Sequence, residues 1–223
     1  MKTKTTFVVG AALILSMVIT ARLTAEAHRE GTLPTGKTPI SNYSSLKETA
    51  DTATNREKEM MIFDFAKTDD QTQWRPINDT VMGGISDSTL QSTKEGKALF
   101  SGIVSLENNG GFASLQSQPA SYNLAGYQGI ALRVKGDGKR YKFSLKTNEY
   151  PDSTRYEAVF NTDKGKWITV NIPFTTLVPT FRGTILNNDL PIDISKVKSF
   201  GLLISDKQEG PFRLEIEWIK AYR

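Results

Sequence analysis

Residues 129–145, with the sequence GIALRVKGDGKRYKFSL, contain two runs in which every second side chain is apolar. The apolar positions are Ile130, Leu132 and Val134 in the first run, and Tyr141, Phe143 and Leu145 in the second. Successive side chains of a strand point to opposite faces of a sheet, so this period of two predicts strands with one buried face. Gly136-Asp137-Gly138 between the runs has the composition of a hairpin turn. The segment therefore predicts an antiparallel β-hairpin.

Similar runs recur along the chain, separated by Gly, Pro, Asn and Asp. We expect about nine strands, at 62–65, 98–107, 112–116, 129–135, 140–147, 155–160, 167–172, 200–205 and 212–221. No amphipathic helix of 10 or more residues is expected among them. Many short strands with regularly spaced turn signals predict an all-β, two-sheet sandwich of the jelly-roll kind.

The N-terminal part of the chain has a different composition. Lys2 and Lys4 precede an apolar run of about 13 residues, 7–19, and small residues follow at 25–27. This pattern predicts a signal peptide over 1–27, because the run is shorter than the roughly 20 residues that a membrane span needs. Residues 28–58 predict a disordered or partly helical tether, and 59–223 the sandwich domain. We expect export, to the periplasm or medium from a bacterium, or to the secretory pathway or an organelle lumen in a eukaryote. No stable membrane span is expected after cleavage.

Charge and cysteine content limit the classes of partner and of chemical site that the chain can have. The chain has 28 basic and 24 acidic residues, and removing 1–27 leaves 25 against 23. A nearly neutral mature chain gives no indication of a nucleic-acid partner. There is no cysteine, so disulfides, thiolate metal sites and a cysteine nucleophile are excluded.

Catalytic groups are scarce. His28 is the single histidine and lies in the predicted tether, which argues against a Ser-His-Asp triad and a histidine zinc site. Loop carboxylates could in principle form a glycosidase pair, but loop aspartates usually serve as turn formers. Glu215 and Glu217 alternate with apolar residues, which predicts a solvated strand face with Trp218 in the core. We expect no enzyme, no metal and no cofactor.

The binding candidates lie mostly in three glycine-containing loops. Glycine pairs make tight turns, or they bring backbone N–H groups close to a ligand, and the sequence favours neither. Trp74 and Trp167 are either core residues or exposed platforms for a sugar ring. We expect the loops 81–86 and 108–112 to be largely ordered and well hydrogen-bonded, and finding them exposed, mobile and far apart would count against a shared site. The candidate ligand- or partner-binding residues are Trp74, Asn78, Asp79, Met82, Gly83, Gly84, Asn108, Asn109, Gly110, Gly111, Asp137, Arg140 and Asp206.

Five segments occur in an order that resembles a known family. They are Asn78–Ser86, Glu107–Ser114, Leu132–Tyr141, Ile172–Phe174 and Phe200–Gln208. Over residues 61–222 the chain resembles the NADH:ubiquinone oxidoreductase complex I intermediate-associated protein family. The resemblance implies a galactose-binding-domain-like β-sandwich. It also implies a non-enzymatic assembly-factor or chaperone role, with subunits of the respiratory complex as protein partners.

Two functions follow as hypotheses. The first is a non-catalytic binding module that assists assembly of a protein partner. The alternative is a carbohydrate-binding β-sandwich module of the cell envelope or secretome, as the fold and the tryptophans would allow.

Overall fold

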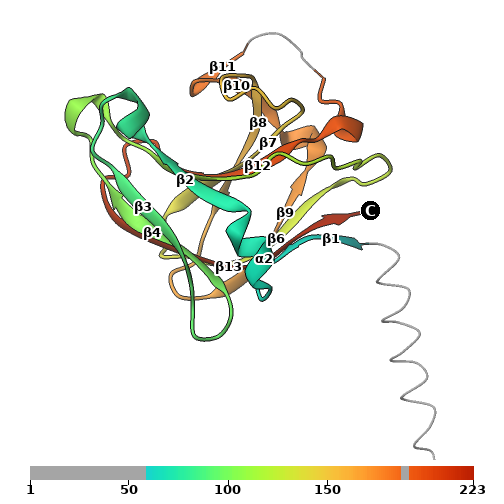
Figure 1. Cartoon of the computed structure of the whole chain (residues 1–223), viewed down its shortest axis with the longest axis horizontal. Helices are drawn as coiled ribbons and strands as arrows, with labels where there is room; N and C mark the ends of the chain where they lie inside the picture. The colour runs from blue at the N-terminus through green and yellow to red at the C-terminus, as the bar shows by residue number, and fades with distance from the viewer. Residues whose placement is uncertain (1–58, 187–190) are drawn as a thin grey trace, which may run out of the picture. The chain divides into compact units, whose positions relative to one another are not determined.

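The computed structural model describes residues 59–186 and 191–223, which form two antiparallel sheets packed around one hydrophobic core (Figure 1). The predicted signal peptide, 1–27, and tether, 28–58, lie outside the described residues. The expected all-β sandwich is confirmed.

The six-stranded sheet has its strands in the order β3-β4-β13-β6-β9, and β1 also pairs with β13. These strands are β1 (Glu59–Asp64), β3 (Asp87–Ser92), β4 (Ala98–Val104), β6 (Gly129–Lys135), β9 (Trp167–Pro173) and β13 (Gly210–Tyr222).

The seven-stranded sheet has the order β11-β10-β8-β7-β12-β5-β2. Its strands are β2 (Trp74–Asn78), β5 (Ala113–Ser117), β7 (Arg140–Lys146), β8 (Arg155–Asn161), β10 (Val178–Phe181), β11 (Thr184–Ile185) and β12 (Ser199–Ile204). The helices are short: α2 (Thr68–Thr72), η1 (Asp79–Met82), η2 (Glu107–Asn109), η3 (Phe174–Thr176) and η4 (Ile194–Lys196).

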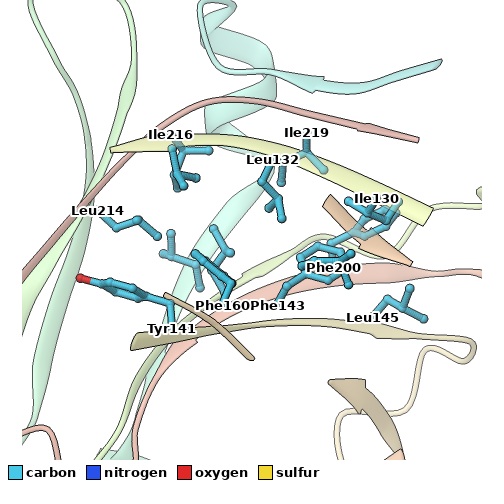
Figure 2. Packing of buried hydrophobic residues seen from close by; sticks show 14 of the residues in the cluster. Ile130, Leu132, Tyr141, Phe143, Leu145, Phe160, Phe200, Leu214, Ile216 and Ile219 are labelled. Carbon is cyan, nitrogen blue, oxygen red and sulfur yellow. The ribbon is translucent and has the colours of Figure 1, made fainter. Parts of the chain in front are cut away.

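The alternating runs of 129–145 become β6 and β7, but they lie in different sheets and face each other across the core. All six apolar side chains predicted to point inward are buried there. Figure 2 shows Leu132 of β6 in the layer opposite Phe143 of β7 and Phe200 of β12. The predicted inward faces are confirmed, and the predicted hairpin is a connection between the two sheets.

Strand β13 corrects one prediction. Its register shifts between Ile216 and Trp218 against β6, so Glu217 is a bulge that exchanges the two faces of the strand. Beyond the bulge Ile219 is buried, while Trp218 is half-buried with the Lys220 ammonium 4.4 Å from its ring centroid. The placement of Trp218 in the core was therefore wrong.

Glu215 also differs from the predicted solvated face. It is buried and pairs with Lys135 at 3.0 Å and Arg213 at 3.0 Å. Burial acts to raise the pKa of Glu215, but hydrogen bonds from the two basic side chains hold it below its usual value.

Four of the thirteen strands had no counterpart among the nine expected: β2, β3, β10 and β11. Strand β3 contains one large apolar residue, Leu90, so it has no legible alternation. Strand β2 contains Pro76, which is tolerated because β2 lies at the edge of its sheet.

Candidate functional site

One end of the sandwich brings together loops that are distant in sequence. Asn78, the last residue of β2, pairs with Ala113, the first of β5, which pairs in turn with Ile204 at the end of β12. In the other sheet Val104, the last residue of β4, pairs with Gly210, the first of β13. The loops 79–86, 105–112 and 205–209 therefore leave the sheets at the same end, as Figure 1 shows for the first two above β2, β3 and β4.

The carboxylate of Asp79 joins the first two of these loops. Its Oδ1 accepts the Ser86 backbone N–H at 2.9 Å, and its Oδ2 accepts the Ser86 hydroxyl at 2.5 Å. Oδ2 also accepts the N–H groups of Gly111, at 2.7 Å, and Phe112, at 3.2 Å. The loops 81–86 and 108–112 are therefore well hydrogen-bonded, as expected, and they lie together.

Asp79 is fully buried, and its charge is stabilised by these donors. Burial acts to raise the pKa of the Asp79 carboxyl, but the hydrogen bonds from Ser86, Gly111 and Phe112 outweigh it and hold the pKa below its usual range. Asp79 is therefore an internal anchor, and a partner cannot contact its carboxylate.

The glycine pairs are needed because the backbone passes very close to Asp79. A Cβ at Gly84 would lie 2.4 Å from Asp79 Oδ1, and one at Gly110 would lie 2.7 Å from Oδ2. Gly83 has φ +93° where η1 ends. The glycines thus combine the two functions that the sequence left open. They make tight turns, and in the second loop backbone N–H groups bind an anion, the Asp79 carboxylate of the same chain.

The two loops present apolar side chains to solvent. Val81 is 69% exposed, Met82 65% and Ile85 51%. Ile103, on the strand that leads into the second loop, and Leu106 within it are also exposed. We call Val81, Met82, Ile85, Ile103 and Leu106 the apolar loop surface. Only Met82 was predicted. Val81 and Ile85 are apolar residues outside every expected strand, which is a signal that could have found them, whereas Ile103 and Leu106 lie within the strand expected at 98–107 and carry no such signal.

The asparagines differ in accessibility. Asn108 and Asn109 are exposed, with φ of 53° and 58°, a left-handed conformation that asparagine tolerates better than most residues. Asn78 is half-buried, and its Oδ1 accepts the Ser88 hydroxyl at 2.6 Å. Asn108 and Asn109 therefore remain available to a partner, whereas Asn78 braces the start of β3.

Asp137 plays a second anchoring role, in the connection from β6 to β7. It accepts the N–H groups of Lys139 at 3.0 Å and Arg213 at 2.9 Å, and the Tyr141 hydroxyl at 3.1 Å. Burial and the Asp137 charge raise the pKa of Tyr141, so the phenol stays protonated and donates.

Arg140 and Asp206 are brought together as well. Arg140 Nη2 lies 3.2 Å from Asp206 Oδ2, and Lys142 Nζ lies 2.9 Å from Asp206 Oδ1. Gln208 exchanges hydrogen bonds with the backbone of Arg140, at 3.0 and 2.6 Å. These contacts fix loop 205–209 against the start of β7.

Trp74 does not form an exposed platform. It is 6% exposed and packs edge-on to Phe63, with ring centroids 5.1 Å apart. Its position on the inner face of β2 makes it a core residue, so the alternative of an exposed platform for a sugar ring does not hold for Trp74. Trp167 is half-buried, with Lys135 Nζ 5.3 Å from its ring centroid.

Residues 59–186 and 191–223 contain neither a metal-binding cluster nor a membrane-spanning helix. No group of three or more His, Cys, Asp or Glu side chains there has the geometry to hold a metal ion. No helix in the same ranges is long and apolar enough to cross a membrane.

Solved structures with a similar fold include carbohydrate-binding modules. The family 11 module of the Clostridium thermocellum cellulase Lic26A-Cel5E has a TM-score of 0.56 and 17% identity, covering 74% of this chain and 94% of the module. The same kind of module in complex with a β-1,3-1,4-mixed-linked tetrasaccharide gives a TM-score of 0.57 at 17% identity, covering 74% of this chain and 95% of the module. At this identity the likeness shows the jelly-roll fold alone.

Curated relatives come from animals and fungi. The mouse protein named complex I intermediate-associated protein 30, mitochondrial, is 26% identical over 186 residues, covering 74% of this chain and 57% of the relative. Its Drosophila melanogaster namesake is 27% identical, covering 71% and 61%. An uncharacterized protein of Schizosaccharomyces pombe is 30% identical, covering 68% and 78%. The chain thus spans about three fifths of the two animal relatives.

These names correct the predicted location. The relatives from mouse, Drosophila melanogaster, Caenorhabditis elegans and Neurospora crassa are named mitochondrial proteins, so export to the periplasm, medium or secretory pathway was the wrong expectation. An apolar run after two lysines is typical of a signal peptide, but that pattern alone does not identify the destination.

The family assignment rests on a match across nearly the whole sandwich. The sequence model of complex I intermediate-associated protein 30 matches residues 63–216, from β1 into β13. The matched range includes both Asp79-linked loops, the connection from β6 to β7, and loop 205–209. The chain belongs to the complex I intermediate-associated protein 30 family.

Proposed function

We propose that this protein is a non-catalytic assembly factor that binds a protein partner through the apolar loop surface. The observation that carries the proposal is that Val81, Met82 and Ile85 are held exposed by a loop whose backbone is fixed internally by Asp79. Exposed apolar side chains grouped on one surface are typical of protein interaction sites. A preorganised loop also loses little conformational entropy on binding.

The partner we propose is an assembly intermediate of respiratory complex I, in mitochondria. The support is the family membership and the names of the animal relatives. Because the chain spans only part of those relatives, the sandwich would supply one of the contacts and need not supply all of them.

The absence of catalysis is also part of the proposal. The loop carboxylates that could have formed an acid pair are engaged inside the protein: Asp79 by Ser86, Gly111 and Phe112, and Asp137 by Arg213 and Tyr141. Asp206 is paired with two basic side chains. Such carboxylates act as anchors, which is the function that the geometry supports for them.

The carbohydrate-binding alternative stays a prediction. Of its two aromatic platforms, Trp74 is enclosed in the core and Trp167 is half-buried beside Lys135. No described contact favours it over the protein partner, so we do not propose it.

The test replaces one exposed apolar residue on the loop surface and one elsewhere. Met82→Asp, in cells that lack their own copy, should reduce complex I on native gels and release the protein from assembly intermediates. The matched control is Ile185→Asp on β11, where the side chain is 61% exposed. Equal assembly with Met82→Asp and wild type, at equal protein levels, would contradict the proposed surface.

A further inference from the structure

A groove of about 440 Å³ opens along one side of the sandwich, between β2, β3 and α2. Figure 1 shows β3 beside β2, with α2 below. The lining residues are Thr68, Gln71, Thr72, Trp74, Pro76, Ser88, Thr89, Leu90 and Ser92. Six of them carry hydroxyl or amide side chains, three are apolar, and none is charged. The groove therefore suits an uncharged ligand that has hydrogen-bonding groups.

The backbone of β3 is unpaired on one side. Thr93 N–H donates to Lys97 O at 2.8 Å, so the pairs in phase with it, such as Gln91 with Leu99, are the hydrogen-bonded ones. The N–H and C=O groups of the alternate residues, Leu90 and Ser92, then point away from β4. Because β3 is the last strand of its sheet, these groups lie on a free edge.

Strand β2 is also an edge, but a blocked one. Gln118 N–H donates to Gln73 O at 2.6 Å, which puts Pro76 among the residues whose backbone faces away from β5. Pro76 has no N–H to offer there, as is usual where an edge strand resists pairing. Strand β3, in contrast, has no proline, no lysine and no bulge.

A second observation marks the groove. Trp74 lines it, and among the described residues the Trp74 Nε1–H is the one buried side-chain donor or acceptor without a partner. Buried polar groups in native proteins nearly always have a partner, so the unpartnered Nε1–H marks this wall of the groove as a place where the fold leaves a hydrogen-bonding group unsatisfied.

We propose that the groove binds an extended, uncharged peptide segment of a partner protein, which adds as a strand to the free edge of β3. Main-chain hydrogen bonds to Leu90 and Ser92 would hold the segment, and the small hydroxyl side chains leave room for it. The groove adjoins the apolar loop surface, because β3 begins two residues after Ile85. The inference nevertheless concerns a second surface, and its test does not require the proposed function.

The first measurement uses the intact protein and a phage library of random 12-residue peptides. We expect uncharged, β-branched sequences to be selected. With a selected peptide bound, hydrogen exchange at the N–H groups of Leu90 and Ser92 should slow at least about tenfold, while Gln91, already bonded to β4, should be unchanged. No binder, or a binder that leaves Leu90 and Ser92 unprotected, would overturn the proposal.

The second measurement separates backbone from side-chain recognition. Ser92→Pro removes a free-edge N–H without removing a bond to β4, and should weaken peptide binding about tenfold. Ser92→Ala removes only the hydroxyl, which donates to Gln71 Oε1 at 2.6 Å, and should change affinity less than about twofold. Equal losses for the two variants, or binding of neutral oligosaccharides in place of peptides, would contradict strand addition.

Two exposed residues of β3 supply a matched pair of substitutions. Thr89 lines the groove and Gln91 does not, although both are exposed on the same strand. Thr89→Lys should weaken the selected peptide at least about fivefold, and Gln91→Lys should leave binding unchanged. The reverse pattern, or no effect of either lysine, would place the peptide elsewhere.

Discussion

Asp79 does for two loops what a metal ion or disulfide does in other proteins: it holds segments together that no strand pairing joins. The cost of burying its charge is offset by four hydrogen bonds at 2.5–3.2 Å. Sequence reasoning found Asp79 and its glycines, but it could not distinguish a carboxylate that binds a partner from one that binds its own chain. That distinction depends on where 110–112 lie, which is set by long-range pairing.

Asp79→Asn should destabilise the fold by about 2–3 kcal/mol at pH 7. The donors of Ser86, Gly111 and Phe112 bond to two carboxylate oxygens in the wild type, and an amide offers them only one acceptor oxygen. Urea unfolding measures the change. Asp87→Asn, on an exposed aspartate at the start of β3, is the control and should cost less than about 0.5 kcal/mol. Equal effects of the two substitutions would show that Asp79 is not an anchor.

The stabilisation by Asp79 should also depend on pH. Its folded pKa is depressed below the ordinary 3.8, so its contribution is complete above the unfolded pKa and is lost as pH falls through the folded pKa. The stability difference between wild type and Asp79→Asn should therefore shrink below about pH 4. A difference that is constant from pH 7 to pH 3 would contradict this assignment.

Lys146 also has a folded pKa below its ordinary value, so its contribution to stability changes with pH in the same direction as that of Asp79, but at higher pH. Lys146 alternates with the inward-facing Tyr141, Phe143 and Leu145 of β7, yet it is 3% exposed because its ammonium donates to the Tyr150 and Pro151 carbonyls of the following loop. Burial and the nearby Arg155 lower its pKa to about 8. The unfolded chain then binds more protons between pH 8 and 10.5, so this residue should add stability as pH rises through that window.

Lys146→Met tests this directly. The wild-type protein should gain about 3 kcal/mol relative to the variant between pH 7 and pH 10.5. Equilibrium unfolding at a series of pH values gives the difference, in which the tyrosines common to both proteins cancel. A pH-independent difference would show that Lys146 is not perturbed.

At the scale of elements, prediction succeeded where one face of a strand is apolar and failed where local chemistry interrupts the pattern. Strand β6 was placed with its observed limits, because its alternation has no interruption. The bulge in β13 was missed, since one extra residue leaves no sign in composition. Strand β3 was missed because its inward side chains include two serines, Ser88 and Ser92, which face the groove.

Because the bulge exchanges the two faces of β13, substitutions of the neighbours Trp218 and Ile219 should differ in their effect on stability. Ile219→Ala should cost about 2–4 kcal/mol, because its side chain is fully buried. Trp218→Ala should cost about 1 kcal/mol, since it removes a half-buried ring on the outer face and its contact with Lys220. Thermal or urea denaturation of both variants shows which of them loses more stability. A larger loss for Trp218→Ala than for Ile219→Ala would contradict the bulge at Glu217.

At the scale of the whole molecule, the two sheets supply one core and place the loops 79–86, 105–112 and 205–209 at one end. The family resemblance predicted the sandwich, and the match to residues 63–216 confirms the family. The predicted export was wrong, because a short apolar N-terminal run does not distinguish export from the mitochondrial location in the relatives' names. What the sequence could not supply was the division of the motif residues into internal anchors, such as Asp79 and Asp137, and exposed contacts, such as Met82.

The measurement that most directly tests the account is site-specific photo-crosslinking inside mitochondria. A photoreactive phenylalanine analogue at Met82 should form a crosslink to a subunit of a complex I assembly intermediate, and the same analogue at Ile185 should not. A crosslink to that subunit from position 185 alone, or none from 82 in mitochondria that are assembling complex I, would contradict the assignment of the Asp79-anchored loops as the binding surface.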